Sequence, residues 1–262
     1  MTVHEDPEGI EITKTQGHVS FSGRSVLEIG CGEGRLTFQY APQAKSVVGI
    51  DPSASAIAAA KKRIPRNLLQ KVRFQVGRGE QMDFPDESFD LVFFTWSLCC
   101  ADIPAMGKAL DEACRVLKPK SILLNIQASL HQPFHKGMIS YLLSRNWGPS
   151  SEDESDRHSR LALRYASLVQ RKFDFIAEEE FPVYTYYDSV DEVLEEVTAG
   201  RKEDYRALDR EAKQHLREII SSLKTRKGVR IQENAVLTVL RKASQRGTQK
   251  VSVRVSGNRH RG

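Results

Sequence analysis

The chain lacks three features that would place it in other classes of protein. No apolar run approaches the roughly 20 residues needed to cross a bilayer, so we expect no membrane-spanning helix. None of the four cysteines, Cys31, Cys99, Cys100 and Cys114, has paired C-x-x-C spacing, so no metal ligand is predicted. The polar, acidic N-terminus does not resemble a signal peptide. We therefore predict an intracellular, reduced and cytoplasmic protein.

Basic charge is scarce outside one end of the chain. The net charge is +5 over 262 residues, but residues 242–262 hold six Lys or Arg and no acid. The remainder is near neutral, which weakens the case for nucleic acid as a partner without excluding it. Low apolar content favours disorder in the tail, residues 243–262. Residues 1–20 show no strong periodicity and form an arm, a lid or a disordered segment.

A glycine-rich turn within residues 26–36, VLEIGCGEGRL, is the feature around which the rest is organised. An apolar run of strand length leads into Gly30, Gly32 and Gly34, and a helix start follows. Strand, glycine turn and helix form the first unit of a doubly wound α/β sheet, whose ligand lies at the carboxyl ends of the strands. A dinucleotide-binding turn would place its third glycine at position 35, which is Arg35. An NAD site is therefore disfavoured, while another nucleotide site or a purely structural turn stays open.

Glu28 stands two residues before the turn and completes an E-x-G-x-G-x-G pattern. This pattern resembles motif I of class I S-adenosylmethionine (SAM) dependent methyltransferases. The resemblance implies that the turn packs against the amino-acid part of SAM and that Glu28 holds its ammonium group, directly or through water. Two further stretches resemble the quinone-type and small-molecule group of that family, GRGEQMDFPDESFD at 77–90 and RVLKP at 115–119. The matches together cover residues 25–127.

The pattern and the resemblance predict a Rossmann-like, doubly wound sheet of seven mostly parallel strands, with an antiparallel C-terminal strand and helices on both faces. The strands are expected at 25–29, 45–53, 71–77, 90–94, 121–127, 178–189 and 231–242. We expect an N-terminal arm at 1–20, a SAM-binding domain at 21–242 and a tail at 243–262. Residues 128–230 would include a helical region that covers the substrate.

Asp51 lies 23 residues after Glu28 at the end of a predicted strand, where such folds place a carboxylate for ribose hydroxyls. The alternative is that Asp51 caps the helix beginning near Ser53. Arg78 replaces the acid that commonly accepts the adenine amino group in that family, so the resemblance leaves this contact to Glu80 or to the Gly79 N–H. The alternative is that Arg78 is simply solvated. The cofactor-binding residues implied by the resemblance are Glu28, Gly30, Gly32, Gly34, Asp51, Pro52, Gly79, Glu80 and Thr95.

The acceptor is less well defined by the sequence. No N-P-P-Y type motif follows the fourth predicted strand, which counts against adenine or cytosine methylation. Trp96 would stack on the cofactor or on an apolar acceptor, or else pack under a helix. Weaker candidates for acceptor binding are Tyr184 and Tyr187. A general base is needed only if the acceptor must lose a proton, and for a hydroxyl acceptor it would be His131 or His135. Cys99 as a nucleophile is disfavoured, because no partner base is evident.

The leading hypothesis is a SAM-dependent methyltransferase acting on a small, fairly apolar metabolite. A second is the same enzyme acting on RNA or protein, with the basic tail as an electrostatic anchor. A third is a non-catalytic SAM- or nucleotide-binding partner module. The departures from the family pattern at Arg78 and at Lys120-Ser121 keep that third hypothesis open. The sequence makes no prediction of oligomeric state.

Overall fold

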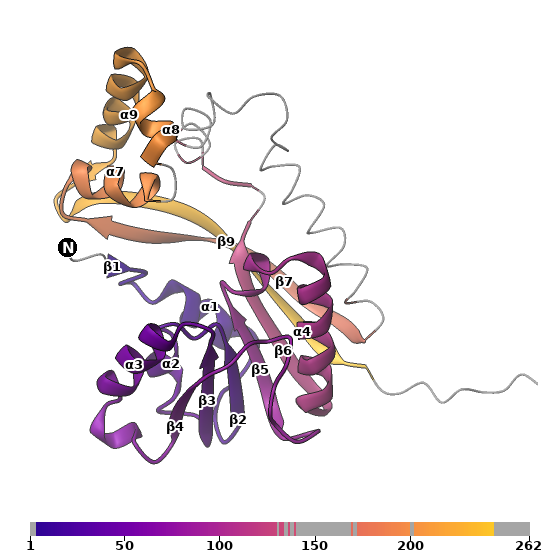
Figure 1. Cartoon of the computed structure of the whole chain (residues 1–262). Coiled ribbons are helices and arrows are strands. Elements are labelled where there is room, and N and C mark those ends of the chain that lie inside the picture. Colours follow the sequence, from indigo (N-terminus) through magenta and orange to yellow (C-terminus); the bar gives the residue numbers. More distant parts are fainter. Residues whose placement is uncertain are drawn as a thin grey trace, which may run out of the picture.

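The computed structural model describes residues 4–129, 131–133, 136, 139, 169, 172–199 and 202–243. Within this part, nine strands form one sheet in the order β1-β7-β9-β6-β5-β2-β3-β4, with β8 paired to β9. Figure 1 shows this sheet with helices on both of its faces. Among the described residues, no helix is long and apolar enough to cross a bilayer.

Five parallel strands form the half of the sheet that carries the glycine turn. They are β2 (Ser25–Ile29), β3 (Ser46–Asp51), β4 (Val72–Val76), β5 (Phe89–Thr95) and β6 (Leu117–Ala128). On β5, Leu91 and Phe93 are buried on one face, and Val92 and Phe94 are buried on the other. A strand covered on both faces has a continuous apolar sequence, which is why these strands could be predicted.

Antiparallel strands complete the sheet. β9 (Gly228–Lys242) is antiparallel to β6, and β7 (Phe173–Tyr187) is antiparallel to β9, so β7 runs in the direction of β6. This confirms the predicted Rossmann-like, mostly parallel sheet with an antiparallel C-terminal strand. The structure adds two strands to the predicted seven, β1 (His4–Glu5) and β8 (Lys224–Thr225). Each has two residues, too few for an alternating pattern to indicate a strand.

Helices cover both faces, as predicted. Those on one face are α1 (Ile10–His18), α2 (Thr37–Tyr40) and α3 (Ala54–Arg63), and α4 (Ile103–Val116) lies on the other. The first three contribute Ile12, Tyr40 and Ile57 to one core, whereas Met106 and Leu110 of α4 belong to the second core. The glycine turn therefore lies between two well-packed layers.

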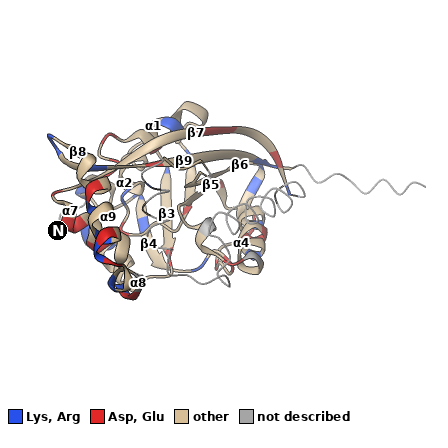
Figure 2. Ribbon diagram, turned by 90° about the horizontal axis from the view of Figure 1, so that it is seen from above, with Lys and Arg blue, Asp and Glu red and all other residues tan. Residues whose placement is uncertain are grey.

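Residues 4–18 join both the sheet and the core. β1 pairs with the end of β7, and α1 buries Ile12 and Thr15. On the outer side of α1, Lys14 and His18 pair with Glu179 of β7 at 2.6 and 2.9 Å. Figure 2, seen from above, shows α1 lying against β7. The sequence had left this segment open between an arm, a lid and disorder.

β6 follows α4 directly, and Pro119 lies near the start of β6. α4 ends at Val116, because a proline disfavours helical conformation in the residue before it and cannot itself donate to the helix. Phe89 pairs with Leu117 and Leu91 pairs with Ile122, so the intervening residues of β6 bulge outward. Lys120, where the family carries glycine, adopts a positive φ of 62° in this bulge.

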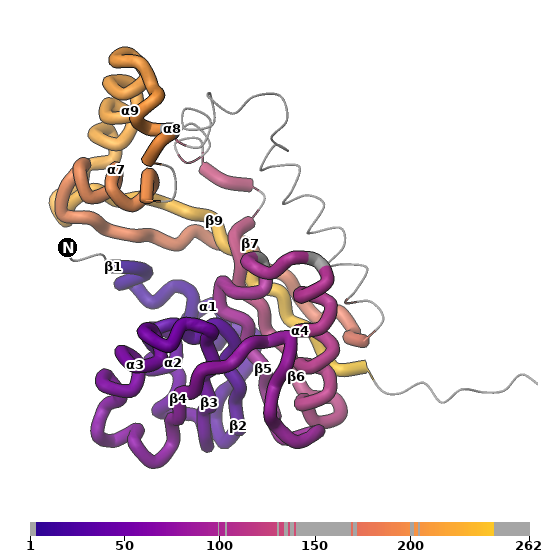
Figure 3. Tube along the Cα trace, in the orientation of Figure 1, coloured from indigo at the N-terminus to yellow at the C-terminus, as the bar shows by residue number. Residues whose placement is uncertain are grey.

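Three helices stand beyond the end of β7, on the side to which the carboxyl ends of the parallel strands point (Figures 1 and 3). They are α7 (Val190–Thr198), α8 (Lys202–Ala207) and α9 (Arg210–Ser222). Val193, Leu216 and Ile220 pack around Tyr187 in a third core. α8 and α9 are separate helices, and the Asp209 carboxylate caps α9 by accepting the Ala212 N–H at 2.7 Å.

The packing of Asn125 on β6 generates a stability prediction. Its side chain is fully buried, and neither its amide nitrogen nor its oxygen has a hydrogen-bond partner among the described residues. A buried unpaired polar group costs about 1–3 kcal/mol. Replacing the amide with the similarly shaped apolar side chain in Asn125→Leu should therefore raise the free energy of unfolding by roughly that amount, as measured by urea denaturation.

Thr238→Val is the matched control. Thr238 is the register neighbour of Asn125 on β9 and is also buried, but its hydroxyl donates to the Glu178 carboxylate at 3.3 Å. Removing a hydroxyl that has a partner should not stabilise the fold. Equal stabilisation by both substitutions, or destabilisation by Asn125→Leu, would show that the unpaired amide is not the cause.

Candidate functional site

A cavity of about 300 Å³ lies at the carboxyl ends of the parallel strands, between the glycine turn and the segment that follows β5. This is the edge at which the sequence predicted a ligand. Several of the predicted residues line it: Gly30, Asp51, Pro52, Gly79, Glu80, Thr95 and Trp96. A second hollow, of about 440 Å³, lies at the opposite edge beside Arg24, Lys120 and Arg241. It contains none of the predicted site residues.

The glycine turn leaves main chain open to the cavity. Gly30 has a φ of 79°, and a Cβ there would lie 2.7 Å from the Ser97 Oγ and closer still to the Ser97 Cβ. Gly32 has a φ of 51°, but a Cβ there would meet nothing within 4 Å. Gly30 is therefore required by packing and lines the cavity, whereas Gly32, which does not line it, needs glycine only for its positive φ. Gly34 packs away from the cavity, against Phe38 and Phe74.

Asp51 ends β3 with its carboxylate against the turn. One oxygen accepts the Gly32 N–H at 2.9 Å, and the other accepts the Ser53 N–H at 2.8 Å. The cap of α3 is supplied by Ser53, whose hydroxyl accepts the Ala56 N–H at 3.2 Å. The alternative that Asp51 is the cap is therefore not what the structure shows. Each carboxylate oxygen keeps a further lone pair that can accept an O–H from a ligand.

Glu28 lies beneath the turn and does not line the cavity. Its side chain is 1% exposed, and one of its oxygens accepts the Thr37 and Tyr40 hydroxyls at 2.5 and 2.7 Å. The other oxygen accepts the Thr95 hydroxyl at 3.1 Å. Burial raises the pKa of the Glu28 carboxyl, although the three hydroxyls oppose this shift. Glu28 thus links β2 to α2 and β5 through these hydrogen bonds. Its contact with the ammonium group of SAM stays a prediction.

The residues after β4 form the part of the cavity expected to hold adenine. The Arg78 side chain is 72% exposed, with its Nε 3.8 Å from the Glu80 carboxylate, whereas the Glu80 side chain is 24% exposed. Gly79 packs closely, because a Cβ there would lie 3.2 Å from Ile29 and 3.3 Å from Ala109. The structure therefore places Arg78 mainly in solvent and leaves Gly79 and Glu80 at the cavity.

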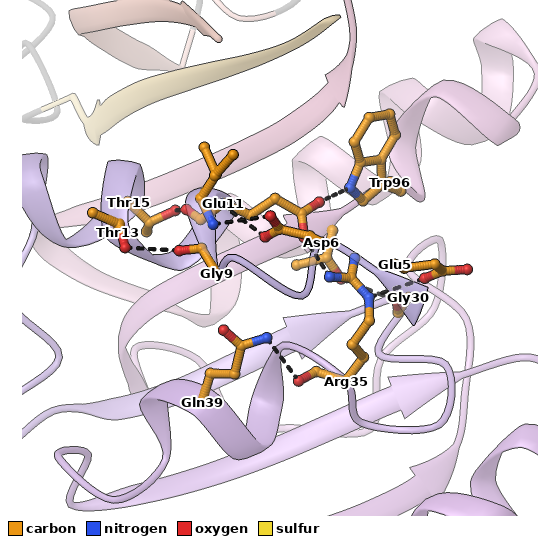
Figure 4. Close-up of polar contacts among 12 residues, drawn as sticks. Glu5, Asp6, Gly9, Glu11, Thr13, Thr15, Gly30, Arg35, Gln39 and Trp96 are labelled. Carbon is orange, nitrogen blue, oxygen red and sulfur yellow. Dashed lines mark hydrogen bonds and ion pairs between the residues drawn. The ribbon is translucent and has the colours of Figure 1, made fainter. Parts of the chain in front are cut away.

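The segment after β5 forms the opposite wall. The Thr95 hydroxyl donates to the Gly30 carbonyl at 3.0 Å, and the Ser97 hydroxyl donates to the Ile29 carbonyl at 2.6 Å. Trp96 stands between them with a φ of 52° and donates its indole N–H to the Glu11 carboxylate of α1 (Figure 4). The sequence placed Trp96 at the site, but nothing in the sequence indicated its contact with Glu11.

The candidates for acceptor binding and proton transfer lie elsewhere. The His131 side chain is 84% exposed and lies 3.1 Å from the Glu180 carboxylate. Tyr184 is stacked under the Arg230 guanidinium at 4.7 Å. Tyr187 is buried among α7 and α9, and burial raises its pKa to about 12. None of the three lines the cavity. His135, the side chain of Cys99 and tail residues 244–262 lie outside the described residues.

Other cavity residues come from the end of β5 and from α4. Ser97 and Leu98 belong to the segment after β5, where a doubly wound fold places ligand contacts, and they add a hydroxyl and apolar surface. Phe94 of β5 and Ala109 of α4 were not singled out, and nothing in the sequence indicated that Ala109 reaches the cavity. Among the described residues, no group of three or more His, Cys, Asp or Glu could hold a metal ion.

Comparison with a family model gives the widest sequence match. Residues 20–154, more than half of the chain, match a family described as a methyltransferase domain. A curated relative, the ubiquinone/menaquinone biosynthesis C-methyltransferase UbiE of Rickettsia massiliae, is 35% identical over 111 residues. That alignment covers 40% of this chain and 44% of the relative, so the chain spans less than half the length of the relative.

Solved structures share the fold at low identity. A SAM-dependent methyltransferase from Methanosarcina mazei superposes with a TM-score of 0.52 and 17% identity, over 87% of this chain and 96% of that one. The [4+2]-cyclase SpnF superposes with a TM-score of 0.54 and 19% identity, over 88% and 80% respectively. One architecture thus appears in proteins named for different reactions, so these likenesses show the fold alone.

The buried carboxyl of Glu28 generates a prediction of pH dependence. Its pKa is raised in the folded state above the ordinary value of 4.5, chiefly because burial disfavours the charged form. Its contribution to stability is therefore complete below about pH 4.5 and is lost as the pH rises toward the folded pKa. Glu28→Gln, which cannot ionise, should lack this loss. The free energy of unfolding of wild type minus that of the variant should fall as the pH rises above 4.5, as measured by urea denaturation.

Taking the difference between two proteins removes the titration of groups common to both. Asp90→Asn is the contrasting control, because the hydrogen bond from Lys118 and the N–H of Ser25 together hold the Asp90 pKa below its ordinary value. The contribution of Asp90 to stability is present at pH values above its ordinary pKa and is lost as the pH falls. The free energy of unfolding of wild type minus that of Asp90→Asn should therefore rise with pH, where the Glu28 difference falls. If the difference in unfolding free energy between wild type and Glu28→Gln does not change with pH, the raised pKa of Glu28 is ruled out.

Proposed function

Because the chain belongs to the methyltransferase-domain family of class I SAM-dependent enzymes, we propose that it transfers a methyl group from SAM to a small, fairly apolar metabolite. The observation that carries the proposal is the Asp51 carboxylate, which accepts the Gly32 N–H of the glycine turn and lines the same cavity as the Gly30 main chain. A carboxylate and exposed main chain are what a ribose and an amino-acid group need from a protein surface. The cavity offers both, the carboxylate from Asp51 at the end of β3 and the main chain from Gly30 at the end of β2.

The residues present fit SAM in three places. Asp51 would accept the ribose hydroxyls, and the backbone around Gly30 and Gly32 would take the amino-acid part. The adenine would lie near Gly79 and Glu80, since the Arg78 side chain points mainly into solvent. Apolar walls from Phe94 and Leu98 suit the adenine and thioether parts of the cofactor.

SAM supplies a methyl group already activated by a positively charged sulfur. The protein therefore has to bind, orient and exclude water rather than provide strong acid or base catalysis. Asp51 is fixed for this task because its two oxygens are held by the Gly32 and Ser53 N–H groups. Thr95 holds the opposite wall against the Gly30 carbonyl. The distance between the two walls is thus set before any ligand binds.

The class of acceptor is proposed from the cavity and from the relatives. Trp96, Leu98 and Ala101 give the wall after β5 an apolar character. The curated relatives are named as C-methyltransferases of ubiquinone and menaquinone biosynthesis, so a carbon atom of a quinone-type ring is the first acceptor to screen. His131 or His135 would act as a base only for a hydroxyl acceptor, and the described cavity-lining residues include no histidine.

We propose the following division of the chain. The SAM-binding domain would span 21–242, and its 128–230 region, which includes α7–α9, would cover the acceptor. The basic tail at 243–262 would act as an anchor only if the acceptor is RNA or protein. We propose the cytoplasm as the site of action.

Calorimetric titration with SAM and with its demethylated product tests the cofactor. Micromolar binding of both is expected in wild type. In Asp51→Ala both should bind roughly 10–100-fold more weakly, because hydrogen bonds to a charged group contribute about 1.5–3 kcal/mol. The affinities of Asp51→Asn, which keeps one carbonyl oxygen, should lie between those of wild type and those of Asp51→Ala.

Glu33→Ala is the matched control. Glu33 belongs to the same turn, but it is exposed and pairs with Arg63, so its removal should leave both affinities within about twofold, since an exposed ion pair contributes little. No binding of either ligand by wild type would refute the SAM-dependent activity. Binding without product from any acceptor in a screen that starts with quinone-type rings would favour the non-catalytic module instead.

A further inference from the structure

Glu11 is a buried carboxylate in a segment that the sequence did not assign to the site. It lies in the first turn of α1 and is 1% exposed. The Asp6 carboxylate fixes the start of this helix by accepting the Ile10 and Glu11 N–H groups, each at 2.9 Å. The Asp6 N–H in turn donates to the Tyr184 carbonyl of β7 at 2.8 Å. The position of Glu11 is therefore set by the fold of residues 4–18.

The two oxygens of Glu11 contact two different segments, the wall of the cavity after β5 and the residue that follows the glycine turn. One accepts the indole N–H of Trp96, which lines the cavity after β5. The other lies 2.5 Å from the Arg35 guanidinium, directly after the glycine turn. Arg35 also pairs with Glu5 at 3.0 Å. Figure 4 shows the Glu11 side chain reaching Trp96 and the Arg35 guanidinium lying close to Glu11, Asp6 and Glu5.

Arg35 occupies the place at which a dinucleotide-binding turn has its third glycine. In this chain the position bears a long cation instead, and that cation ties the turn to residues 4–18. Because glycine here would remove both ion pairs, the altered spacing has a structural consequence. The turn gains a link to α1 that a packed third glycine does not provide.

The positive φ of Trp96 has to be stabilised by contacts with its surroundings. A positive φ is unusual for a bulky residue and costs on the order of 1 kcal/mol, so the surroundings must hold it. The hydroxyls of Thr95 and Ser97 bind the backbone of the glycine turn from either side of Trp96. The indole N–H of Trp96 binds Glu11, which fixes the ring at the cavity wall.

Burial makes the three side chains interdependent. A carboxylate removed from water is strongly destabilising unless it is paired and hydrogen-bonded. Glu11 meets this requirement only while Arg35 and Trp96 are both in place. Loss of either partner therefore disturbs the contact of Glu11 with the other.

We propose that Glu11 is a positioning residue of the SAM site, which acts by holding Trp96 in the cavity wall and linking that wall to the glycine turn through Arg35. The inference rests on the proposed function for the identity of the ligand. It extends the site to residues 4–18, and it makes ligand affinity depend on the docking of α1. Glu11 itself does not line the cavity, so its effect on the ligand passes through Trp96.

The test uses the full chain carrying Trp147→Phe, which leaves Trp96 as the one tryptophan of the two in the sequence. Glu11→Ala, Glu11→Gln and Trp96→Phe are compared, singly and with Trp96→Phe added to each Glu11 variant. Calorimetry gives the Kd for SAM and for its demethylated product. Acrylamide quenching of Trp96 fluorescence without ligand reports the exposure of the ring. Glu11→Gln keeps an acceptor for the indole N–H, so it tests the contact even if Glu11→Ala folds poorly.

Glu11→Ala should raise the Kd for SAM about tenfold and make Trp96 more accessible to acrylamide, with a smaller change in Glu11→Gln. When Trp96→Phe is already present, the Glu11 substitutions should raise the Kd for SAM by less than a further factor of two. The control is Lys14→Met, which removes the ion pair of α1 with Glu179 on the outer side of the same helix. It should leave both readouts unchanged.

Two results would overturn the inference while leaving the proposed function intact. One is an unchanged Kd in the Glu11 variants, and the other is a full Glu11 effect on Kd that persists in the Trp96→Phe background. Failure of the Trp147→Phe parent to bind SAM, when wild type also fails, would instead remove the proposed function and this inference with it.

Discussion

The close contact between Gly30 and the segment Thr95–Ser97 is the constraint on which the site depends. A side chain at position 30 would collide with Ser97, so the carboxyl ends of β2 and β5 can meet at this distance only over a glycine. The Thr95 and Ser97 hydroxyls then bind the Gly30 and Ile29 carbonyls, and the residue between them, Trp96, is left in a left-handed backbone conformation. The width of the cavity and the placement of its aromatic wall both follow from this one contact.

Two buried carboxylates stabilise this arrangement from opposite sides of the turn. Glu28 binds three hydroxyls beneath it, from Thr37, Tyr40 and Thr95, and Glu11 joins Trp96 to Arg35 above it. The two solutions differ physically. Glu28 has no cation among its hydrogen-bond partners, and burial raises its pKa, whereas Glu11 is paired directly with a guanidinium. The turn is therefore held by the hydrogen bonds of Glu28, whose raised pKa favours the neutral carboxyl, and by the Glu11–Arg35 ion pair, to which α1 contributes Glu11.

The sequence predicted the parts of this structure that local pattern determines. Five parallel strands follow from apolar runs that are buried on both faces, and the ligand edge follows from Gly30, Gly32 and the acid at the end of β3. It did not predict that Glu28 is turned into the core, because a carboxylate next to a glycine turn has the same sequence whether it faces ligand or hydroxyls. The Glu11 contacts join residues 24 and 85 positions apart, and no periodicity carries that information. β1 and β8 were missed because two residues show no alternation.

The fold alone does not decide what such a cavity does, since the same architecture occurs in a methyltransferase and in a [4+2]-cyclase. What such a protein does is decided by the residues around its cavity and by the segments that reach it. In this chain residues 4–18 reach the cavity through Glu11 and Trp96, and α7–α9 stand beyond the end of β7. The Asp6 N–H bond to the Tyr184 carbonyl and the pairing of β1 with β7 connect the two. We therefore expect specificity for the acceptor to come from these joined segments, because the glycine turn, whose Gly30 main chain lines the cavity, would be occupied by the cofactor.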